Sequence, residues 1–289
     1  MHLKMPIFSI IIPTFNRRQK LECALNSVLS QLNSDSEVVV VDDGSTDGTS
    51  RLISEINDSR IKYFYQENAG VCKARNHGAF RSSGDYLLFL DSDDNMEPGY
   101  LDEMRNSFSG NDILFIGASI FSEGKIKKTV LPSKPYGEPS ETGLFLAGTF
   151  AVKREIFIES GGYDEFLTYA ENTELSFRIK SKISNRFFID KCLLRINQPV
   201  YRTSSSPKNI YTSVSRIITI HQSLFKTNPG LYSLYLNNLG VSCLRLGYHT
   251  EARDHFSHSI ILKPFNIRPY LRFILTFFPK KFISKYVYT

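Results

Sequence analysis

The amino-acid sequence predicts an α/β fold with a mainly parallel sheet flanked by helices, followed by an all-helical C-terminal appendage. Short runs of β-branched and aromatic residues alternate with helix-sized segments through the first hundred residues. These runs are almost continuously apolar, as strands covered on both faces are. After a serine-rich stretch near residue 204 the pattern becomes helical throughout. We therefore expect an α/β domain over residues 1–206 and a helical region over residues 207–289.

The first half of the chain alternates strand and helix signals. Leu21, Ala24, Leu25 and Val28 recur at helical spacing, which predicts a helix between the first two strands. Alternation of strands and helices favours a parallel sheet, because the connecting helices pack on its faces. The expected strands span residues 8–12, 37–41, 61–65, 86–90 and 113–116.

The pattern becomes irregular over residues 119–142, where glycines and prolines interrupt it repeatedly. We expect a hairpin followed by a long loop there. A shorter α/β segment follows, with a helix expected over 174–182 and a strand over 186–190. The stretch YRTSSSP at 201–207 predicts a loop.

The C-terminal region has the periodicity of packed helices. Within residues 239–264, spaced leucines, Gly247 and the Glu251-Ala252-Arg253 triplet are similar to one tetratricopeptide-type helical hairpin. About three such repeats are needed for an independent solenoid, so we expect an appendage on the α/β domain. An ordinary helix pair with a chance resemblance is the alternative.

The stretch at 267–287 mixes aromatic and basic residues and contains RPYLRFILTFFPKKFISKYV. This composition is typical of interfacial helices that bury an apolar face at the lipid headgroup boundary and are attracted to anionic lipids. The alternative is an apolar stripe that packs on the α/β domain, with basic side chains extending to solvent.

Polar clusters follow three of the expected strands. PTFN begins at Pro13, DDGSTD begins at Asp42, and DSDD begins at Asp91. Open parallel sheets bind ligands beyond the carboxyl ends of their strands. If these strands are parallel and adjacent, the three clusters therefore line one cleft.

The acids after the strand at 86–90 need a compensating charge. Asp91, Asp93 and Asp94 are close in sequence, and ionised carboxylates repel one another and lose hydration on burial. The chain has neither GxxxxGK[ST] nor GxGxxG behind a strand, so a bound nucleotide needs another counter-charge. Asp91 and Asp93 can supply it by holding Mg²⁺ or Mn²⁺, which prefer oxygen ligands and bridge phosphates. The alternative is a solvated turn whose aspartate caps the helix near Pro98.

Four motifs in order carry a resemblance to a known family. They are FSIIIPTFNR at 8–17, VVVVDDGSTDGT at 38–49, NAGVCKARNHGAFRSSGDYLLFLDSDD at 68–94 and GGYDE at 161–165. The sequence therefore resembles glycosyltransferase family 2, the inverting nucleotide-sugar enzymes of GT-A type, Rossmann-like fold, over residues 6–205.

The resemblance implies a nucleoside site after the first two strands. Pro13, Thr14 and Asn16 would lie against the nucleoside, and Asp43 would hydrogen-bond the base, which in this family is often uracil. The alternative is that Asp43 or Asp47 caps the following helix.

The resemblance also implies a donor and metal site. Asp91 and Asp93 match the family's Asp-x-Asp element, with Asp93 preferred as the direct metal ligand and Asp94 as a second candidate. The donor cleft near the sugar and diphosphate would contain Arg75. The alternative for Arg75 is a surface position on an amphipathic helix. The residues expected along this cleft are Lys73, Arg75 and Asn76.

The general base departs from the family pattern. The family places Glu-Asp shortly after GGxDE, with the Asp as base, but this chain has AENTEL, with Asn172 in that position. An amide cannot accept the acceptor's proton. We expect Glu171 to be the catalytic base; a register shift to Glu174, an impaired protein, or Glu171 and Asn172 serving only as a helix cap are the alternatives.

The bulk composition limits the partners and the compartment. The net charge of +6 suits an anionic ligand, a phosphate-rich substrate or an acidic membrane surface. The four cysteines are scattered without a CxxC pair, which indicates a reducing compartment and no structural metal. No run reaches the roughly 18 to 20 apolar residues that span a bilayer. We expect a cytoplasmic protein, or one peripheral on the cytoplasmic face of the inner membrane.

These observations together predict a metal-dependent inverting glycosyltransferase that uses Mn²⁺ or Mg²⁺. It would move a sugar from a nucleoside diphosphate donor, UDP-linked, to a saccharide or lipid-linked glycan hydroxyl. The resemblance to the family further implies a role in bacterial surface polysaccharide synthesis. Nucleic acid is excluded as a partner, because the cleft motifs are acidic and the basic residues form no aromatic-interleaved surface. Asn172 motivates the alternative of a catalytically impaired nucleotide-sugar-binding scaffold. Acceptor specificity is expected in residues 119–142 and 201–207.

Overall fold

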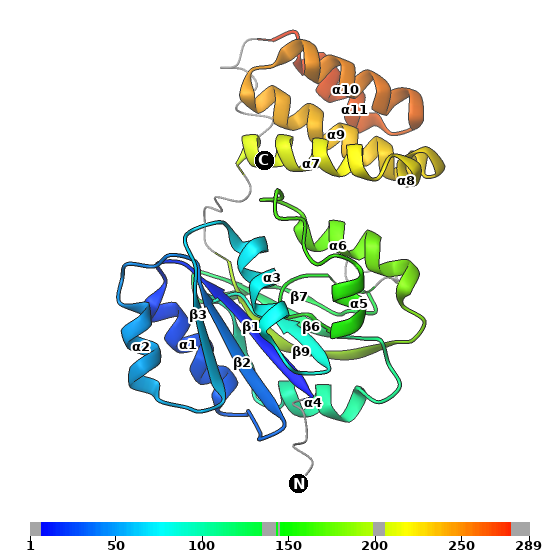
Figure 1. The fold of residues 1–289 in the computed structure, drawn as a ribbon. Helices are drawn as coiled ribbons and strands as arrows, with labels where there is room; N and C mark the ends of the chain where they lie inside the picture. Colours follow the sequence, from blue (N-terminus) through cyan, green and yellow to red (C-terminus); the bar gives the residue numbers. More distant parts are fainter. Residues whose placement is uncertain (1–6, 135–142, 144, 199–205, 279–289) are drawn as a thin grey trace. The chain divides into compact units, whose positions relative to one another are not determined.

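A computed structural model describes residues 7–134, 143, 145–198 and 206–278 of the chain (Figure 1). The chain divides into two compact units: Met1–Glu165 with Glu171–Val200, and Phe166–Ala170 with Tyr201–Thr289. Each unit is described below by itself. Within the described ranges, no helix combines the length and the apolar character needed to cross a membrane.

The first unit is built on one nine-stranded sheet in the order β3-β2-β1-β4-β8-β6-β9-β5, with β7 paired to β6. The β3-β2-β1-β4 part is parallel, β6 and β9 are also parallel, and β8, β5 and β7 add antiparallel pairs. The strands are β1 Phe8–Thr14, β2 Ser36–Asp42, β3 Ile61–Tyr65, β4 Tyr86–Phe89, β5 Asn95–Met96, β6 Ile113–Ser122, β7 Lys125–Val130, β8 Phe150–Lys153 and β9 Arg186–Asn197.

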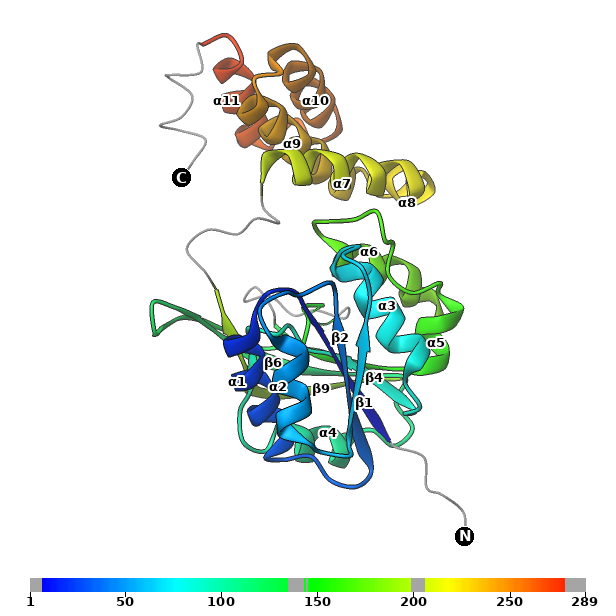
Figure 2. The ribbon, with the colours of Figure 1, turned by 60° about the vertical axis from the view of Figure 1, so that its left-hand side comes forward.

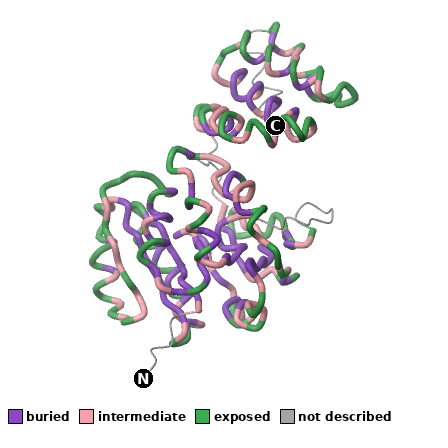
Figure 3. The backbone as a smooth tube through the Cα atoms, turned by 45° about the vertical axis from the view of Figure 1, so that its right-hand side comes forward, coloured by how far each residue is buried: buried purple, intermediate pink, exposed green. Residues whose placement is uncertain are grey.

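The two faces of the sheet are covered by different helices, as Figure 2 shows. Successive side chains of a strand point to opposite faces. Ile10 and Val38 accordingly pack in a core with α1, α2 and α4, whereas Ile11 and Val39 pack in a second core with α3, α5 and α6. The helices are α1 Arg18–Leu29, α2 Thr49–Ile56, α3 Val71–Arg81, α4 Tyr100–Ser107, α5 Arg154–Glu159 and α6 Glu171–Ile179. The central strands are the most completely buried part of the tube in Figure 3.

The sequence predicted this α/β architecture, and the structure confirms it. The expected strands of the first half are present, and the hairpin expected after residue 119 is the β6–β7 pair. β9 continues to Asn197, seven residues beyond the expected end, because β6 and β5 both supply it with ladder partners. The helix expected over 174–182 begins earlier, at Glu171, and ends in a 3₁₀ turn, η1 Lys180–Lys182. Residues 135–142 and 201–205 of the expected loops lie outside the described residues.

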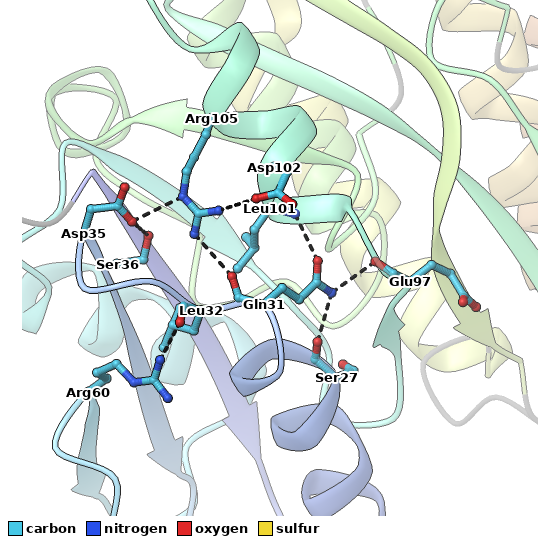
Figure 4. A network of polar contacts seen from close by, with 10 residues as sticks. All are labelled: Ser27, Gln31, Leu32, Asp35, Ser36, Arg60, Glu97, Leu101, Asp102 and Arg105. Carbon is cyan, nitrogen blue, oxygen red and sulfur yellow. Dashed lines mark hydrogen bonds and ion pairs between the residues drawn. The ribbon is translucent and has the colours of Figure 1, made fainter.

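A polar network anchors the end of α1 to α4 and β5 (Figure 4). The Gln31 amide donates to the carbonyl of Glu97 at 3.1 Å and accepts from the N–H of Leu101 at 3.3 Å. Arg105 donates to the carbonyl of Gln31 and to the carboxylate of Asp35. These bonds satisfy backbone groups near the end of the helix, where intrahelical partners run out.

The second unit contains α7 Pro207–Ile220, α8 Gln222–Thr227, α9 Pro229–Leu246, α10 His249–Leu262 and α11 Ile267–Leu275. Asn228 caps α9, where its side chain accepts from the N–H of Leu231, and Gly247 ends it with a φ of 89°. α9 and α10 pack closely, since a Cβ on Gly240 would lie 2.5 Å from the ring of Phe256. The hairpin expected over 239–264 therefore corresponds to the second half of α9 and to α10.

Candidate active site

Polar residues at the carboxyl ends of β1, β2 and β4 lie at one edge of the sheet. Thr14 and Asp42 are register partners at the ends of β1 and β2. On the other side of β1, the N–H of Leu90 donates to the carbonyl of Ile11 at 2.9 Å, directly before Asp91. This is the edge at which open parallel sheets bind ligands.

Asp43 organises the loop that enters α3. It is 4% exposed, and its Oδ1 accepts from the amide of Gln66 at 2.7 Å and from the N–H of Ala69 at 2.8 Å. Its Oδ2 accepts from the N–H of Gly70, the N-cap residue of α3, at 2.9 Å. A carboxylate has about four acceptor positions, so these three bonds leave room for one to a base.

The loops after β1 and β2 are joined by hydrogen bonds. The N–H of Asn16 donates to Ser45 Oγ at 2.9 Å, and Asn16 Oδ1 accepts from the N–H of Thr46 at 2.8 Å. The Asp47 carboxylate accepts from the N–H groups of Arg18 and Thr49 at the starts of α1 and α2. Asn16 is exposed, whereas Pro13 and Thr14 are buried in β1.

Arg75 is a buried cation that joins two acids from different elements. Its side chain is 2% exposed, one Nη donates to Asp91 Oδ1 at 2.6 Å, and the other donates to Glu171 Oε1 at 3.0 Å. Burial alone would lower the pKa of Arg75, but the charges of Asp91 and Glu171 help raise it well above its ordinary value. The surface position considered for this residue is therefore wrong. Lys73, two positions earlier on α3, is exposed.

Asn76 holds the GGYDE segment against α3. Its Oδ1 accepts from the N–H of Tyr163 at 2.8 Å, and its amide donates to the carbonyl of Tyr163 at 2.9 Å and to Glu165 at 3.1 Å. Gly162 has a φ of 69°, and a Cβ there would lie 2.6 Å from Asn76 Oδ1. Glycine is therefore required at 162 both by its left-handed backbone and by the close approach of the amide.

A second network surrounds Glu171 at the start of α6. The Tyr163 hydroxyl donates to Asn172 Oδ1 at 2.8 Å, and the Asn172 amide donates to Glu171 Oε1 at 3.4 Å. The Arg75 guanidinium lies 5.2 Å from the centre of the Tyr163 ring, and burial raises the pKa of that phenol. Glu171 therefore receives hydrogen bonds from a cation and an amide.

Glu174 lies in a different environment from Glu171. It is 0% exposed, and its Oε1 accepts from Nε of Arg178 at 2.6 Å. A carboxylate so enclosed is poorly placed to meet an incoming hydroxyl.

Asp93 and Asp94 contact different partners. Asp93 Oδ1 lies 2.9 Å from Arg17 Nη1, and its Oδ2 lies 3.7 Å from Lys20 Nζ. Asp94 Oδ1 accepts from the N–H of Asn197 at 2.8 Å, and the Asn197 amide donates to the carbonyl of Asp93. The end of β9 thus fixes the backbone of the acidic loop.

The carboxylates of the acidic loop can be compared with the ligands that a divalent ion requires. Among the residues that the structure describes, no group of three or more His, Cys, Asp or Glu side chains is arranged to hold a metal. Mg²⁺, however, is usually held by one or two carboxylates together with substrate phosphates and waters. Arg17 and Lys20 on Asp93 are 45% and 57% exposed. Asp91 and Asp93 offer carboxylate oxygens of this kind, and an ion held by both would have to displace the two exposed side chains from Asp93.

A hollow of about 460 Å³ lies at the opposite end of β4. Its lining includes Gly84 and Asp85, which precede β4, and Lys153 and Arg154 at the end of β8. It is therefore remote from the carboxyl ends of the parallel strands, and we assign it no role.

Several contributors to the site were not among the expected residues. Tyr163 and Arg17 stood within quoted motifs, but the sequence did not indicate their partners. Asn197 and Lys20 gave no signal at all, because their positions depend on the pairing of β9 and on the packing of α1.

Known proteins resemble this chain. A family model described as glycosyl transferase family 2 matches residues 9–194. A GalNAc(5)-diNAcBac-PP-undecaprenol beta-1,3-glucosyltransferase of Campylobacter jejuni is 37% identical over 129 residues, which cover 43% of this chain and 42% of that protein. The chain spans less than half the length of the first curated relatives it matches.

Solved structures share the fold. TarS 1-349 of S. aureus in complex with UDP-GlcNAc aligns with a TM-score of 0.65 and 20% identity, over 93% of this chain and 89% of that chain. A mannosyltransferase, PcManGT from Pyrobaculum calidifontis in complex with GDP-Man and Mn²⁺, aligns with a TM-score of 0.58 and 16% identity, over 97% and 81% of the two chains. These similarities confirm the GT-A type fold expected from the sequence.

Proposed function

Because the chain belongs to glycosyl transferase family 2, we propose that it is a metal-dependent, inverting glycosyltransferase. The donor would be a nucleoside diphosphate sugar, UDP-linked. The acceptor would be a hydroxyl of a saccharide or of a lipid-linked glycan, at the cytoplasmic face of the inner membrane, in the synthesis of a bacterial surface polysaccharide. The observation that carries this proposal is the buried Arg75, which holds the metal-ligand candidate Asp91 and the base candidate Glu171 together at the ligand-binding edge of the sheet.

The donor would occupy the edge formed by β1, β2 and β4. We assign Pro13, Thr14, Asn16 and Asp43 to the nucleoside. The sugar and diphosphate would lie toward Asp91 and the start of α3, where Lys73 is exposed, and Arg75 and Asn76 would hold the surrounding wall. TarS was solved with UDP-GlcNAc and PcManGT with GDP-Man, so both nucleotides must be tested.

Asp91 and Asp93 would hold Mg²⁺ or Mn²⁺. Such an ion neutralises the charge of a diphosphate leaving group. Arg17 and Lys20, once they leave Asp93, are long enough and exposed enough to contact the same diphosphate. Asn197 keeps the acidic loop in place through its bonds to Asp93 and Asp94.

Glu171 would act as the general base. In an inverting transfer the acceptor hydroxyl attacks the anomeric carbon, the bond to the diphosphate oxygen breaks, and the hydroxyl proton passes to the base. Glu171 is 19% exposed and bonds to the same buried Arg75 as Asp91, whereas Glu174 is fully buried and bonded to Arg178.

Asn172 would position that base rather than replace it. The Tyr163 hydroxyl fixes the amide with its oxygen toward the phenol, which directs the Nδ2 group toward Glu171 Oε1. With one carboxylate oxygen held by Arg75 and the amide, the other is left to face the acceptor. Tyr163→Phe should therefore lower kcat several-fold with little change in the KM of the donor.

The first experiment measures nucleoside diphosphate release from UDP-, GDP- and dTDP-sugars with Mn²⁺, Mg²⁺ or EDTA. We expect slow, metal-dependent release from one donor, which Asp93→Asn abolishes. Release that is equally fast in EDTA would contradict the metal assignment.

The second experiment identifies the base. Glu171→Gln should reduce turnover by about 10²–10⁴, the usual contribution of a general base. Asn172→Asp should not raise turnover, because it places a second negative charge beside Glu171. If Asn172→Asp raised turnover and made Glu171→Gln tolerable, the base assignment would be wrong.

A catalytically impaired nucleotide-sugar-binding scaffold is the second candidate, favoured by Asn172 alone. If the protein is such a scaffold, it should bind nucleotide in a metal-dependent manner but turn over no donor with any acceptor. Turnover should then appear only in Asn172→Asp.

A further inference from the structure

The second unit exposes an apolar face on α11, the last helix that the structure describes. The side chains recur at spacings of one, three and four residues, which places them on one side of α11 and the turn after it. Their exposed fractions run from 39% at Tyr270 to 67% at Ile267. We call this set the α11 apolar face, and its members are Ile267, Tyr270, Leu271, Ile274, Phe277 and Phe278.

The opposite side of α11 is fixed by packing. Pro269 and Thr276 are buried, and Phe273 packs against the core formed by Cys243, Leu244, Ala252 and Phe256. The helix therefore already has an apolar partner on one side. Soluble proteins rarely leave a large contiguous apolar patch uncovered, so the second apolar side indicates a binding surface.

The charged residues of α11 itself are both positive. Arg268 and Arg272 lie on α11, and Arg245 lies close enough that burial and the charges of Arg268 and Arg245 lower the pKa of Arg272. Residues 255–289 contain no aspartate or glutamate. A second copy docked symmetrically on this face would bring arginines toward arginines, whereas an anionic surface would complement them.

We propose that the α11 apolar face docks on an anionic membrane surface. Ile267, Leu271 and Ile274 would enter the headgroup boundary. Arg268, which flanks the face next to Leu271, would contact lipid phosphates, and Arg272 would add to the positive potential. A helix with a strongly apolar face and adjacent basic residues binds bilayers in this manner without crossing them. The inference concerns a surface other than the candidate active site, and it stands or falls independently of turnover.

A fluorescent reporter tests insertion directly, because the chain contains no tryptophan. Leu271 and Ile126 are both 57% exposed, the first on α11 and the second on β7, so they form a matched pair of sites. Leu271→Trp in the full chain should show a blue shift of its emission with vesicles of phosphatidylcholine and phosphatidylglycerol. Ile126→Trp should show none. Equal shifts at both sites, or no shift at Leu271→Trp, overturn the proposal.

Sedimentation with the same vesicles tests the charges. Arg268→Gln with Arg272→Gln should weaken binding at low salt at least tenfold, since each basic residue near an anionic surface contributes appreciably. The control removes two exposed charges elsewhere, Lys125→Gln with Lys127→Gln, and should change binding little. Equal losses in the two double variants overturn the proposal.

Self-association is the competing explanation of the apolar face. Light scattering of the full chain should give a monomer, and Leu271→Ser with Ile274→Ser should lose vesicle binding while remaining a monomer. A dimer that dissociates in this double variant would identify the face as an interface between copies and overturn membrane docking.

Discussion

Arg75→Met removes the buried cation between Asp91 and Glu171 while retaining an unbranched side chain. Removing one partner of a fully buried ion pair costs about 3–5 kcal/mol, because a charge is left uncompensated. The Asp91 side chain is 36% exposed and that of Glu171 19%, so water screens the two stranded carboxylates. We therefore expect a loss of about 2–3 kcal/mol in the free energy of unfolding.

Thermal unfolding followed by circular dichroism measures this loss in the first unit. At about 2–4 °C per kcal/mol for a domain of this size, the midpoint should fall by roughly 4–12 °C. Arg51→Met is the matched control. Arg51 is 81% exposed and contacts Glu55 on the surface of α2, so its loss should shift the midpoint by no more than about 2 °C.

A triple variant separates charge from packing. Arg75→Met combined with Asp91→Asn and Glu171→Gln removes the stranded charges along with the cation and should recover at least half of the lost stability. Charge compensation at this position would be refuted if Arg75→Met and Arg51→Met had the same unfolding midpoint. It would also be refuted if the triple variant were no more stable than Arg75→Met alone.

Three further predictions concern other parts of the first unit. Gly162→Ala should reduce turnover at least tenfold, as measured by diphosphate release, because its Cβ would displace the Asn76 amide and because alanine is strained at a φ of 69°; full activity would contradict this. Gly78→Ala should destabilise the unit by about 1–2 kcal/mol in urea unfolding, since its Cβ would lie 2.6 Å from a methyl group of β1; unchanged stability would show that the helix can shift. Hydrogen bonds from Arg60 lower the pKa of Asp58 from 3.8 to about 2. This pair therefore stabilises the folded state at pH values above 3.8, and the stabilisation is lost as the pH falls toward 2. Asp58→Asn should therefore cost about 1 kcal/mol at pH 7, with allowance for partial exposure, and the difference from the natural protein should shrink below about pH 4; a constant difference across this range would refute the assignment.

The parallel half of the sheet could be predicted because its signal is local. Val38, Val39, Val40 and Val41 are all buried, so one run of β-branched residues reveals a strand covered on both faces. The end of β9 could not be predicted in this way. The apolar run near Leu194 was visible, but how far a strand continues depends on partners distant in sequence.

In the candidate site, too, local features could be predicted from the sequence and long-range contacts could not. The position of Asp91 follows from the strand before it, and the departure at Asn172 was visible from the motif. The burial of Arg75 was not, because an arginine is tolerated in the interior only when acids such as Asp91, after β4, and Glu171, in α6, are brought to it. The assignment of Asp43 to a base was made without knowledge of its bonds to the loop that precedes α3, and it stays a prediction.

The length of β9 has a consequence for the order in which the molecule is assembled. β1, β2, β3 and β4 find all their parallel partners before Leu90, so they can pair early while the chain is being synthesised. Asn197 bonds to Asp94 and Asp93 in the acidic loop, although it lies 103 and 104 positions further along the chain. Contacts of such long range form late, because a large loop must close first. Before Asn197 is synthesised, the nascent chain would therefore have a largely paired parallel half-sheet, but the acidic loop would lack its bonds to Asn197. Chaperones would be most needed during that interval.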